Sequence, residues 1–157
     1  MYAVEGERSI DIAAPPDRVW TLVANVDRMG EWSPHTFRAE WVDAANGDGP
    51  AVGRRFRGTN RLPIVRQWTS TATVTACEPG RRFAFAVGKK PDDPNTLWSY
   101  DFAPSRAGTR VTERWQMRRE PVIVLAYYRL IGQRDRLALG VEETLRRLKA
   151  AAEAQSS

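Results

Sequence analysis

The chain has 157 residues, a length typical of one domain, and 42% of them are hydrophobic, which is enough for a core without cross-links. Its single cysteine, Cys77, excludes an internal disulfide and a thiolate metal cluster, and such cysteine usage is typical of the reducing cytoplasm. The net charge of +5 is modest and scattered, so we expect no nucleic-acid partner, and we treat residues 1–157 as a single domain.

The first 35 residues predict one strand followed by two short helices. Residues 8–13 alternate apolar and polar side chains, as in a half-buried strand. Residues 15–17 (Pro-Pro-Asp) break this pattern and begin a helix over 18–25. A second helical turn is expected over 27–29 and should stop at Gly30, with a loop over 31–35. The N-terminus lacks the apolar stretch of a signal peptide, so we predict a cytoplasmic protein.

From residue 36 the apolar period changes to two, which indicates strands. We predict them over residues 36–41, 54–61, 67–78, 83–87, 97–103 and 109–119. Turns are expected at 46–50, 79–80 and 107–108, an interruption at 62–64, and an exposed loop at 89–95. In the long strand 67–78, strict alternation predicts that Ala76 faces the same side as Trp68, while Cys77 faces away with a row of threonines.

The last third of the chain predicts a long helix over residues 121–154. Its apolar stripe repeats every three or four residues: Leu137, Val141, Leu145, Leu148 and Ala152. An unbroken helix of this length would exceed a small domain, so we expect a bend or break near Gly132. The apolar run at 122–131 is about half as long as a membrane span requires, so we predict no transmembrane segment.

The order of elements is strand, two short helices, six strands and a long helix. Segregated strands and helices are typical of the α+β class, and an antiparallel sheet with one covered face fits the alternation. The long apolar stripe needs a partner surface, which only the sheet supplies. We therefore predict a seven-stranded antiparallel sheet with the last helix lying across it.

With these elements in place, the chain resembles the START-like, or Bet v 1-like, helix-grip superfamily, specifically its bacterial polyketide cyclase/dehydrase-type branch. Four stretches and the final helix carry the resemblance: residues 12–20, 27–34, 53–58 and 108–113. The resemblance implies a curved sheet gripping the last helix, with an internal cavity that takes an apolar or aromatic small molecule. The same fold hosts carriers and enzymes, so function depends on the site.

If the predicted faces are right, aromatic side chains and a few polar groups line the concave side of the sheet. That composition is typical of a small-molecule pocket, and also of a filled core. The candidate ligand-binding residues are Trp32, Phe56, Asn60, Trp68, Ser70, Phe85, Trp98, Tyr100, Glu113, Trp115 and Met117, with Tyr127 and Tyr128 from the last helix.

Three residues are candidates for proton transfer if the protein is an enzyme. Glu113 interrupts an apolar face, so it must either raise its pKa or pair with an arginine or a backbone group. Tyr100 is the second candidate. The third is His35, the one histidine, for which an exposed loop position is the alternative interpretation. With one histidine and one cysteine, no metal site or cofactor is expected.

A stripe of arginines (Arg55, Arg57, Arg61 and Arg66) is interpreted as the solvated outer face of the sheet. It also keeps open a weaker hypothesis, in which the domain docks on a membrane surface or another protein. The leading hypothesis is binding of a lipid- or polyketide-like molecule in the cavity, by a monomer or homodimer. The second hypothesis is a polyketide cyclase or dehydratase that uses Glu113, Tyr100 or His35.

Overall fold

A computed structural model describes residues 2–42, 49–61, 67–118 and 121–154 of the chain. Seven strands form one antiparallel sheet: β1 (Tyr2–Ile12), β2 (Thr36–Trp41), β3 (Arg55–Asn60), β4 (Trp68–Glu78), β5 (Arg82–Val87), β6 (Thr96–Pro104) and β7 (Thr109–Arg118). Between β1 and β2 lie α1 (Pro16–Ala24), a 3₁₀ turn at Val26–Arg28 and α2 (Met29–Trp32), and the chain ends with α3 (Val122–Leu130) and α4 (Gln133–Ala154).

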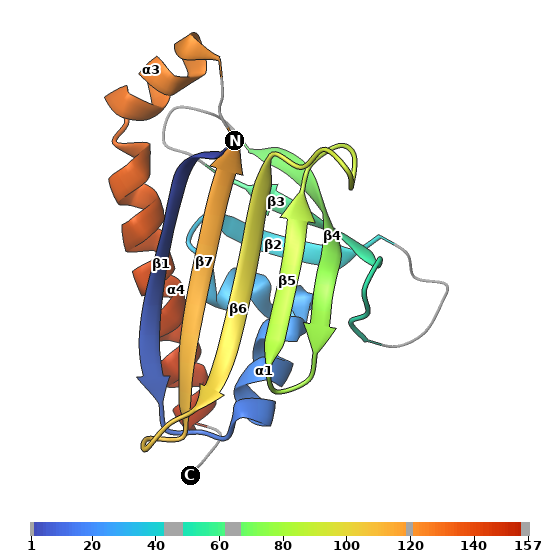
Figure 1. Ribbon diagram of the computed structural model, residues 1–157, viewed down its shortest axis with the longest axis vertical. Helices are drawn as coiled ribbons and strands as arrows, with labels where there is room; N and C mark the ends of the chain where they lie inside the picture. Colours follow the sequence, from blue (N-terminus) through green and yellow to red (C-terminus); the bar gives the residue numbers. More distant parts are fainter. Residues whose placement is uncertain (1, 43–48, 62–66, 119–120, 155–157) are drawn as a thin grey trace.

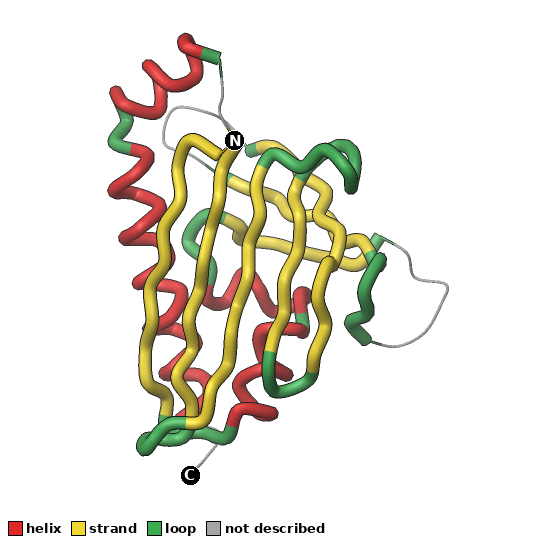
Figure 2. The backbone as a smooth tube through the Cα atoms, in the orientation of Figure 1, coloured by secondary structure: helices red, strands yellow, loops and turns green. Residues whose placement is uncertain are grey.

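The strand order is β1-β7-β6-β5-β4-β3-β2. Strands β2 to β7 therefore form a meander, and the N-terminal strand β1 pairs with its last strand at one edge of the open sheet. The sheet curves strongly: β2 and β3 run across the direction of the other strands, and α1, α2 and α4 lie on the side toward which they curl (Figure 1). The tube drawing shows the same layering, with the helices grouped on one side of the sheet (Figure 2). The predicted α+β helix-grip fold is confirmed.

The break in the C-terminal helix falls where the sequence predicts it. Gly132 has φ of +64°, a left-handed conformation that favours glycine because it has no Cβ. Beside this break, Arg136 Nε donates a 2.6 Å hydrogen bond to the carbonyl oxygen of Ile131. The break separates α3, which stands beyond the end of the sheet, from α4, which packs along it (Figure 1).

The prediction that Gly30 ends the second helix is wrong. Helix α2 continues through Gly30 to Trp32. A Cβ on Gly30 would lie 2.1 Å from the carbonyl oxygen of Phe37, so this glycine permits a close approach between α2 and β2. The residue therefore serves packing between two elements, which single-sequence patterns do not separate from a helix stop.

Strict alternation also fails in β4. The pairing with β5 shifts between Val74 and Ala76, which is a β-bulge, and beyond it Cys77 pairs with Phe83. A bulge inserts one residue and reverses the parity of the strand after it. Phe83 is fully buried, and Cys77 packs against the core instead of facing away from it with the row of threonines.

Among the other predictions, one strand is longer in the structure than expected, and several predicted features lie outside the described residues. Strand β1 begins at Tyr2 rather than residue 8, because it pairs with nearly the whole length of β7. Most of the predicted turn at 46–50, the interruption at 62–64, Arg66 and the C-terminal end of the predicted strand 109–119 lie outside the described residues. The arginines at 55, 57 and 61 are exposed, as expected for an outer face.

The C-terminal end of α4 is held at the corner between β1 and α1. Lys149 Nζ donates to the carbonyl oxygen of Asp11 at 2.9 Å, and the backbone N–H of Ala13 donates to Glu153 Oε1, also at 2.9 Å. At this end of the sheet the concave face is filled by four buried residues: Phe102, Val111, and Leu145 and Leu148 of α4. This end of the domain is closed core.

Packing between β1 and β7 predicts that Gly6 tolerates no side chain. A Cβ there would lie 2.4 Å from the indole ring of its cross-strand partner Trp115, which is itself 3% exposed. We expect Gly6→Ala to lower the free energy of unfolding by about 1–3 kcal/mol, because the ring has to shift within a packed layer. Urea unfolding measures the change, and Glu5→Ala, at the exposed neighbouring position, is the control. Equal stabilities of the two variants would contradict this packing.

Candidate functional site

A cavity of about 450 Å³ lies between the sheet and α4, toward the end of the domain that carries α3. Its volume lies within the range of roughly 300–1,000 Å³ that small-molecule sites occupy. Strand β6 shows how it is built: Thr96, Trp98 and Tyr100 line the cavity, whereas Phe102, two residues further, belongs to the buried core. The cavity therefore has an outer mouth and a closed inner end.

Helix α4 forms one wall with residues that lie on a single face. Gln133, Leu137, Gly140, Val141 and Thr144 line the cavity and are spaced four, three, one and three apart. One of them, Gly140, has no side chain, and the imidazole of His35 lies in the space beside it. Further along the same face, Leu145 and Leu148 fill the interior.

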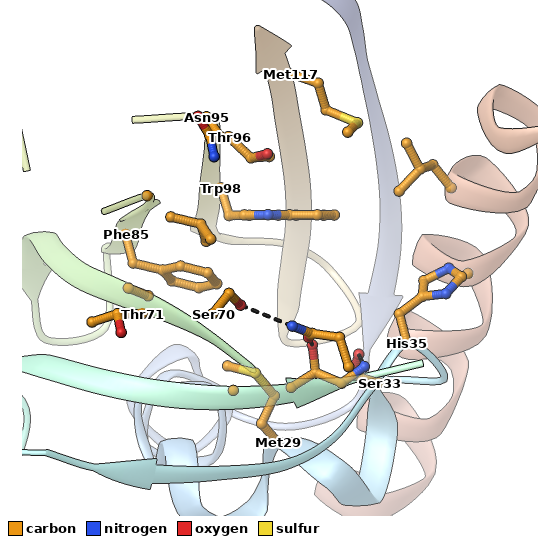
Figure 3. Close-up of a pocket in the computed structure, with 18 of the residues that line it drawn as sticks. Met29, Ser33, His35, Ser70, Thr71, Phe85, Asn95, Thr96, Trp98 and Met117 are labelled. Atoms are coloured by element: carbon orange, nitrogen blue, oxygen red, sulfur yellow. Dashed lines mark hydrogen bonds between the residues drawn. The ribbon is translucent and has the colours of Figure 1, made fainter. Parts of the chain in front are cut away.

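Exposed residues form the rim of the cavity. Trp68 at the start of β4 is 38% exposed, and Lys89 and Asn95 belong to the exposed β5–β6 loop. Tyr128 reaches the cavity from α3. The close-up shows Asn95, Thr96 and Met117 on one side of Trp98 and the ring of Phe85 beside it (Figure 3).

Ten of the thirteen predicted ligand-binding residues line this cavity: Phe56, Asn60, Trp68, Ser70, Phe85, Trp98, Tyr100, Glu113, Met117 and Tyr128. The other three do not. Trp32 is 3% exposed and packs in the core from α2. Trp115 stacks over Gly6, with its ring centroid 6.4 Å from that of Trp98. The ring centroid of Tyr127 lies 6.0 Å from that of Tyr128 on α3.

Glu113 and Tyr100 form a buried pair at the closed end. They are cross-strand neighbours on β7 and β6, and the Tyr100 hydroxyl donates to Glu113 Oε1 at 2.7 Å. Glu113 is 2% exposed, and its partner is a tyrosine rather than the arginine or backbone group considered from the sequence. Among the described residues, Glu113 Oε2 has no hydrogen-bond partner.

Burial sets the protonation of this pair. It raises the pKa of Glu113 to about 8, although the hydrogen bond from Tyr100 acts in the opposite direction. Burial and the neighbouring Glu113 also raise the pKa of the Tyr100 hydroxyl. Both groups are therefore neutral at pH 7. Because Oε1 accepts from Tyr100, the acid proton belongs on Oε2, where it is a hydrogen-bond donor without a described protein acceptor.

A second polar group lies on the wall formed by β2, β3 and β4. Thr36 Oγ1 donates to Asn60 Oδ1 at 2.7 Å, and Asn60 Nδ2 donates to Ser70 Oγ at 2.8 Å, one of the bonds drawn in Figure 3. The Ser70 hydroxyl keeps its own proton to donate. Asn60 thus joins neighbouring strands while presenting polar atoms to the cavity.

His35 is half-buried rather than exposed, which corrects the interpretation of an open loop position. Its imidazole packs against α4, where a Cβ on Gly140 would lie 2.3 Å from Nε2. Nε2 lies 3.4 Å from the carbonyl oxygen of Arg136. Burial lowers the pKa of His35, so the ring is neutral at pH 7. Figure 3 shows His35 beside α4. Its contacts are therefore separate from the Glu113–Tyr100 hydrogen bond.

The sequence did not single out several lining residues, among them Met29, Ser33, Thr36, Gln133, Gly140 and Thr144. A signal existed for those of α4, because Gly140 and Thr144 fall on the same helical face as Leu137 and Val141.

A family model described as "Polyketide cyclase / dehydrase and lipid transport" matches residues 3–153. The Polyketide_cyc-like protein Cgl2372 from Corynebacterium glutamicum is 31% identical, with a TM-score of 0.63 over 98% of this chain and 93% of that chain. No curated protein matches this chain significantly.

Two more distant structures share the fold. The di-domain ARO/CYC StfQ from the steffimycin biosynthetic pathway has a TM-score of 0.75 at 20% identity, covering 99% of this chain but 52% of its own. This chain therefore spans about half of StfQ. The KanY protein has a TM-score of 0.72 at 17% identity, over 98% of this chain and 99% of that one. At these identities the likeness concerns the fold alone.

The raised pKa of Glu113 makes stability depend on pH with a defined sign. Between the unfolded pKa near 4.5 and the folded pKa of about 8, the folded state holds a proton that the unfolded state releases, so stability falls as pH rises through this window. Glu113→Gln keeps an acceptor for Tyr100 and a neutral donor. We expect this variant to gain stability relative to wild type between pH 5 and 8, by at most about 1.4 kcal/mol per pH unit.

Urea unfolding at several pH values measures this difference, with Glu5→Gln as the exposed control. A constant difference between Glu113→Gln and wild type across the window would show that Glu113 is ionised in the folded protein.

Proposed function

Since the chain belongs to the polyketide cyclase/dehydrase and lipid transport family, we propose that it binds an apolar or aromatic small molecule in the cavity between the sheet and α4. One observation carries the proposal: a cavity of about 450 Å³ combines an aromatic wall with a buried, unsatisfied polar atom at its closed end. An unpaired buried polar group costs free energy unless a ligand or water satisfies it.

The walls favour a ligand with an apolar or aromatic body. Phe56 and Phe85 meet edge to face with centroids 5.0 Å apart, and Trp98 continues this aromatic surface on β6. Aromatic faces and edges of this kind pack well against flat rings and extended chains. Met29 and Met117 add adaptable apolar contacts at either side.

The closed end favours an oxygen acceptor on that ligand. Glu113 in its acid form directs a donor from Oε2, and a carbonyl or hydroxyl oxygen supplies the missing acceptor. The interior also favours an uncharged group, because Glu113 and His35 are both neutral at pH 7. Of the described lining residues, the one with an ammonium group is Lys89, which belongs to the exposed β5–β6 loop. The proposed ligand therefore enters with a neutral, oxygen-bearing end first.

The same pair supports a second function, cyclisation of a poly-β-ketone. A protonated carboxyl with a pKa near 8 is suited to general acid catalysis at neutral pH. In this scheme the enol carbon of the substrate adds to one of its own carbonyl carbons while Glu113 gives its proton to that carbonyl oxygen. The enol O–H then releases a proton that restores the Glu113 acid, so protons balance. Tyr100 would hold the carboxyl in place through its hydrogen bond.

Native mass spectrometry of the protein purified from its own host tests ligand binding. We expect a discrete added mass on part of the protein. Trp98→Ala should lower the bound fraction by about tenfold or more, because it removes a large aromatic contact in the cavity. Trp20→Ala is the matched control, since Trp20 lies outside the cavity lining on α1, where its indole N–H donates to the carbonyl oxygen of Arg82. A mass of the bare chain, or equal effects of both variants, would contradict the proposal.

Deuterium exchange at the central carbon of a small aromatic β-diketone, benzoylacetone, separates the two functions. A catalyst should accelerate exchange above the buffer rate, and Glu113→Gln should reduce the acceleration by roughly 10²–10⁴-fold. A binding protein should give no acceleration, while Glu113→Gln keeps affinity for the compound within about tenfold. NMR follows both quantities in the same sample, with Glu5→Gln as the control.

A further inference from the structure

Helix α3 is apolar apart from its two tyrosines and Arg129, yet one of its faces is open to solvent. Val122 and Ile123 are 83% and 80% exposed, and Leu130 is 81% exposed. None of the nine residues described for α3 is buried. A helix that is apolar all round is normally covered on every side. Contiguous exposed apolar surface of this kind is typical of an interaction site.

The exposed residues lie on one helical face. Val122, Ile123, Ala126, Arg129 and Leu130 are exposed and are spaced one, three, three and one apart, so they adjoin on the helix surface. We call these five residues the α3 outer face. The residues between them, including Tyr127 and Tyr128, are half-buried and face the domain, with Tyr128 in the cavity lining.

Charge around the α3 outer face indicates what covers it. From Pro121 to Arg136 the chain carries three arginines (Arg129, Arg134 and Arg136) and one acidic residue, Asp135, and all four are exposed. The two lysines of the nearby β5–β6 loop are balanced by Asp92 and Asp93, and Asp93 pairs with Arg118. An apolar face with a positive margin is complementary to a lipid bilayer with anionic headgroups.

The position of α3 adds a second argument. Helix α3 and the β5–β6 loop lie at the same end of the domain, the end of the sheet opposite the β6–β7 turn (Figure 1). Residues of both segments, Tyr128 and Lys89, form part of the rim of the cavity. A surface that binds through the α3 outer face therefore meets the protein next to the cavity mouth.

We propose that the α3 outer face docks the protein on an anionic lipid bilayer, with the cavity mouth beside the membrane. The docking is peripheral: in the described part of the chain, no helix combines the length and apolar content of a membrane span. Apolar side chains enter the headgroup region and the arginines contact lipid phosphates. The proposal rests on the surface of α3 and not on the identity of any cavity ligand.

Co-sedimentation with phosphatidylcholine vesicles, with and without phosphatidylglycerol, tests the docking. We expect binding to the anionic vesicles that weakens as salt is added. Val122→Glu should reduce partition by at least about tenfold, because it replaces an apolar contact with a like charge. The same substitution at Val52, which is 64% exposed outside α3, should leave partition unchanged. Arg129→Gln should weaken binding to anionic vesicles.

Equal partition of Val122→Glu and wild type would overturn the proposal, as would equal losses for Val122→Glu and Val52→Glu. Failure of the wild type to bind anionic vesicles would overturn it too. Light scattering without vesicles tests whether a second copy of the chain covers the α3 outer face instead. Dimerisation that Val122→Glu abolishes would assign the face to that second copy. None of these results alters the ligand-bound fraction seen by native mass spectrometry, so the cavity proposal is judged separately.

Discussion

The packing of α4 against the concave face of the sheet is the constraint on which the rest of the structure depends. One curved sheet has one face that needs a cover, and α4 supplies the long apolar stripe that fits it. Around Leu145 and Leu148 sheet and helix close into a core, and along the same face from Gln133 to Thr144 they leave a cavity. The packing of this one helical face thus separates the filled part of the domain from the open part.

The buried carboxyl and hydroxyl groups of the cavity lie at the boundary between the filled core and the open part of the domain. Glu113 and Tyr100 occupy that boundary on neighbouring strands, where burial keeps the carboxyl protonated. A charged carboxylate there would require an arginine, and the hydrogen bond that the structure shows comes instead from a neutral tyrosine. The site therefore presents a proton donor inside an apolar wall, an arrangement that suits both recognition of a carbonyl and proton transfer to it.

The predictions from the sequence are right for most of the fold. Those for Gly30 and Cys77 are wrong for the same physical reason. Gly30 reads as a helix stop, whereas it actually gives α2 a close approach to Phe37. Strict alternation places Cys77 with the threonines, whereas a bulge in β4 moves it to the core side. Both depend on contact with a neighbouring strand, at Phe37 of β2 and Phe83 of β5, which the periodicity of the stretch itself does not reveal. The predicted cavity set is subject to the same limit: Trp115 points inward, but its ring lies over Gly6 rather than in the cavity.

By itself, the sequence determined the α+β class, the order of its elements, the antiparallel pairing and the break at Gly132, because hydrophobic periodicity and glycine conformation are local properties. It also indicated that Glu113 interrupts an apolar face. Only the tertiary structure decided that Glu113 meets Tyr100, that His35 packs on Gly140 rather than facing solvent, and that one side of α3 remains exposed. Those outcomes depend on side-chain volumes and on which surfaces meet, and neither is set by any one stretch of sequence.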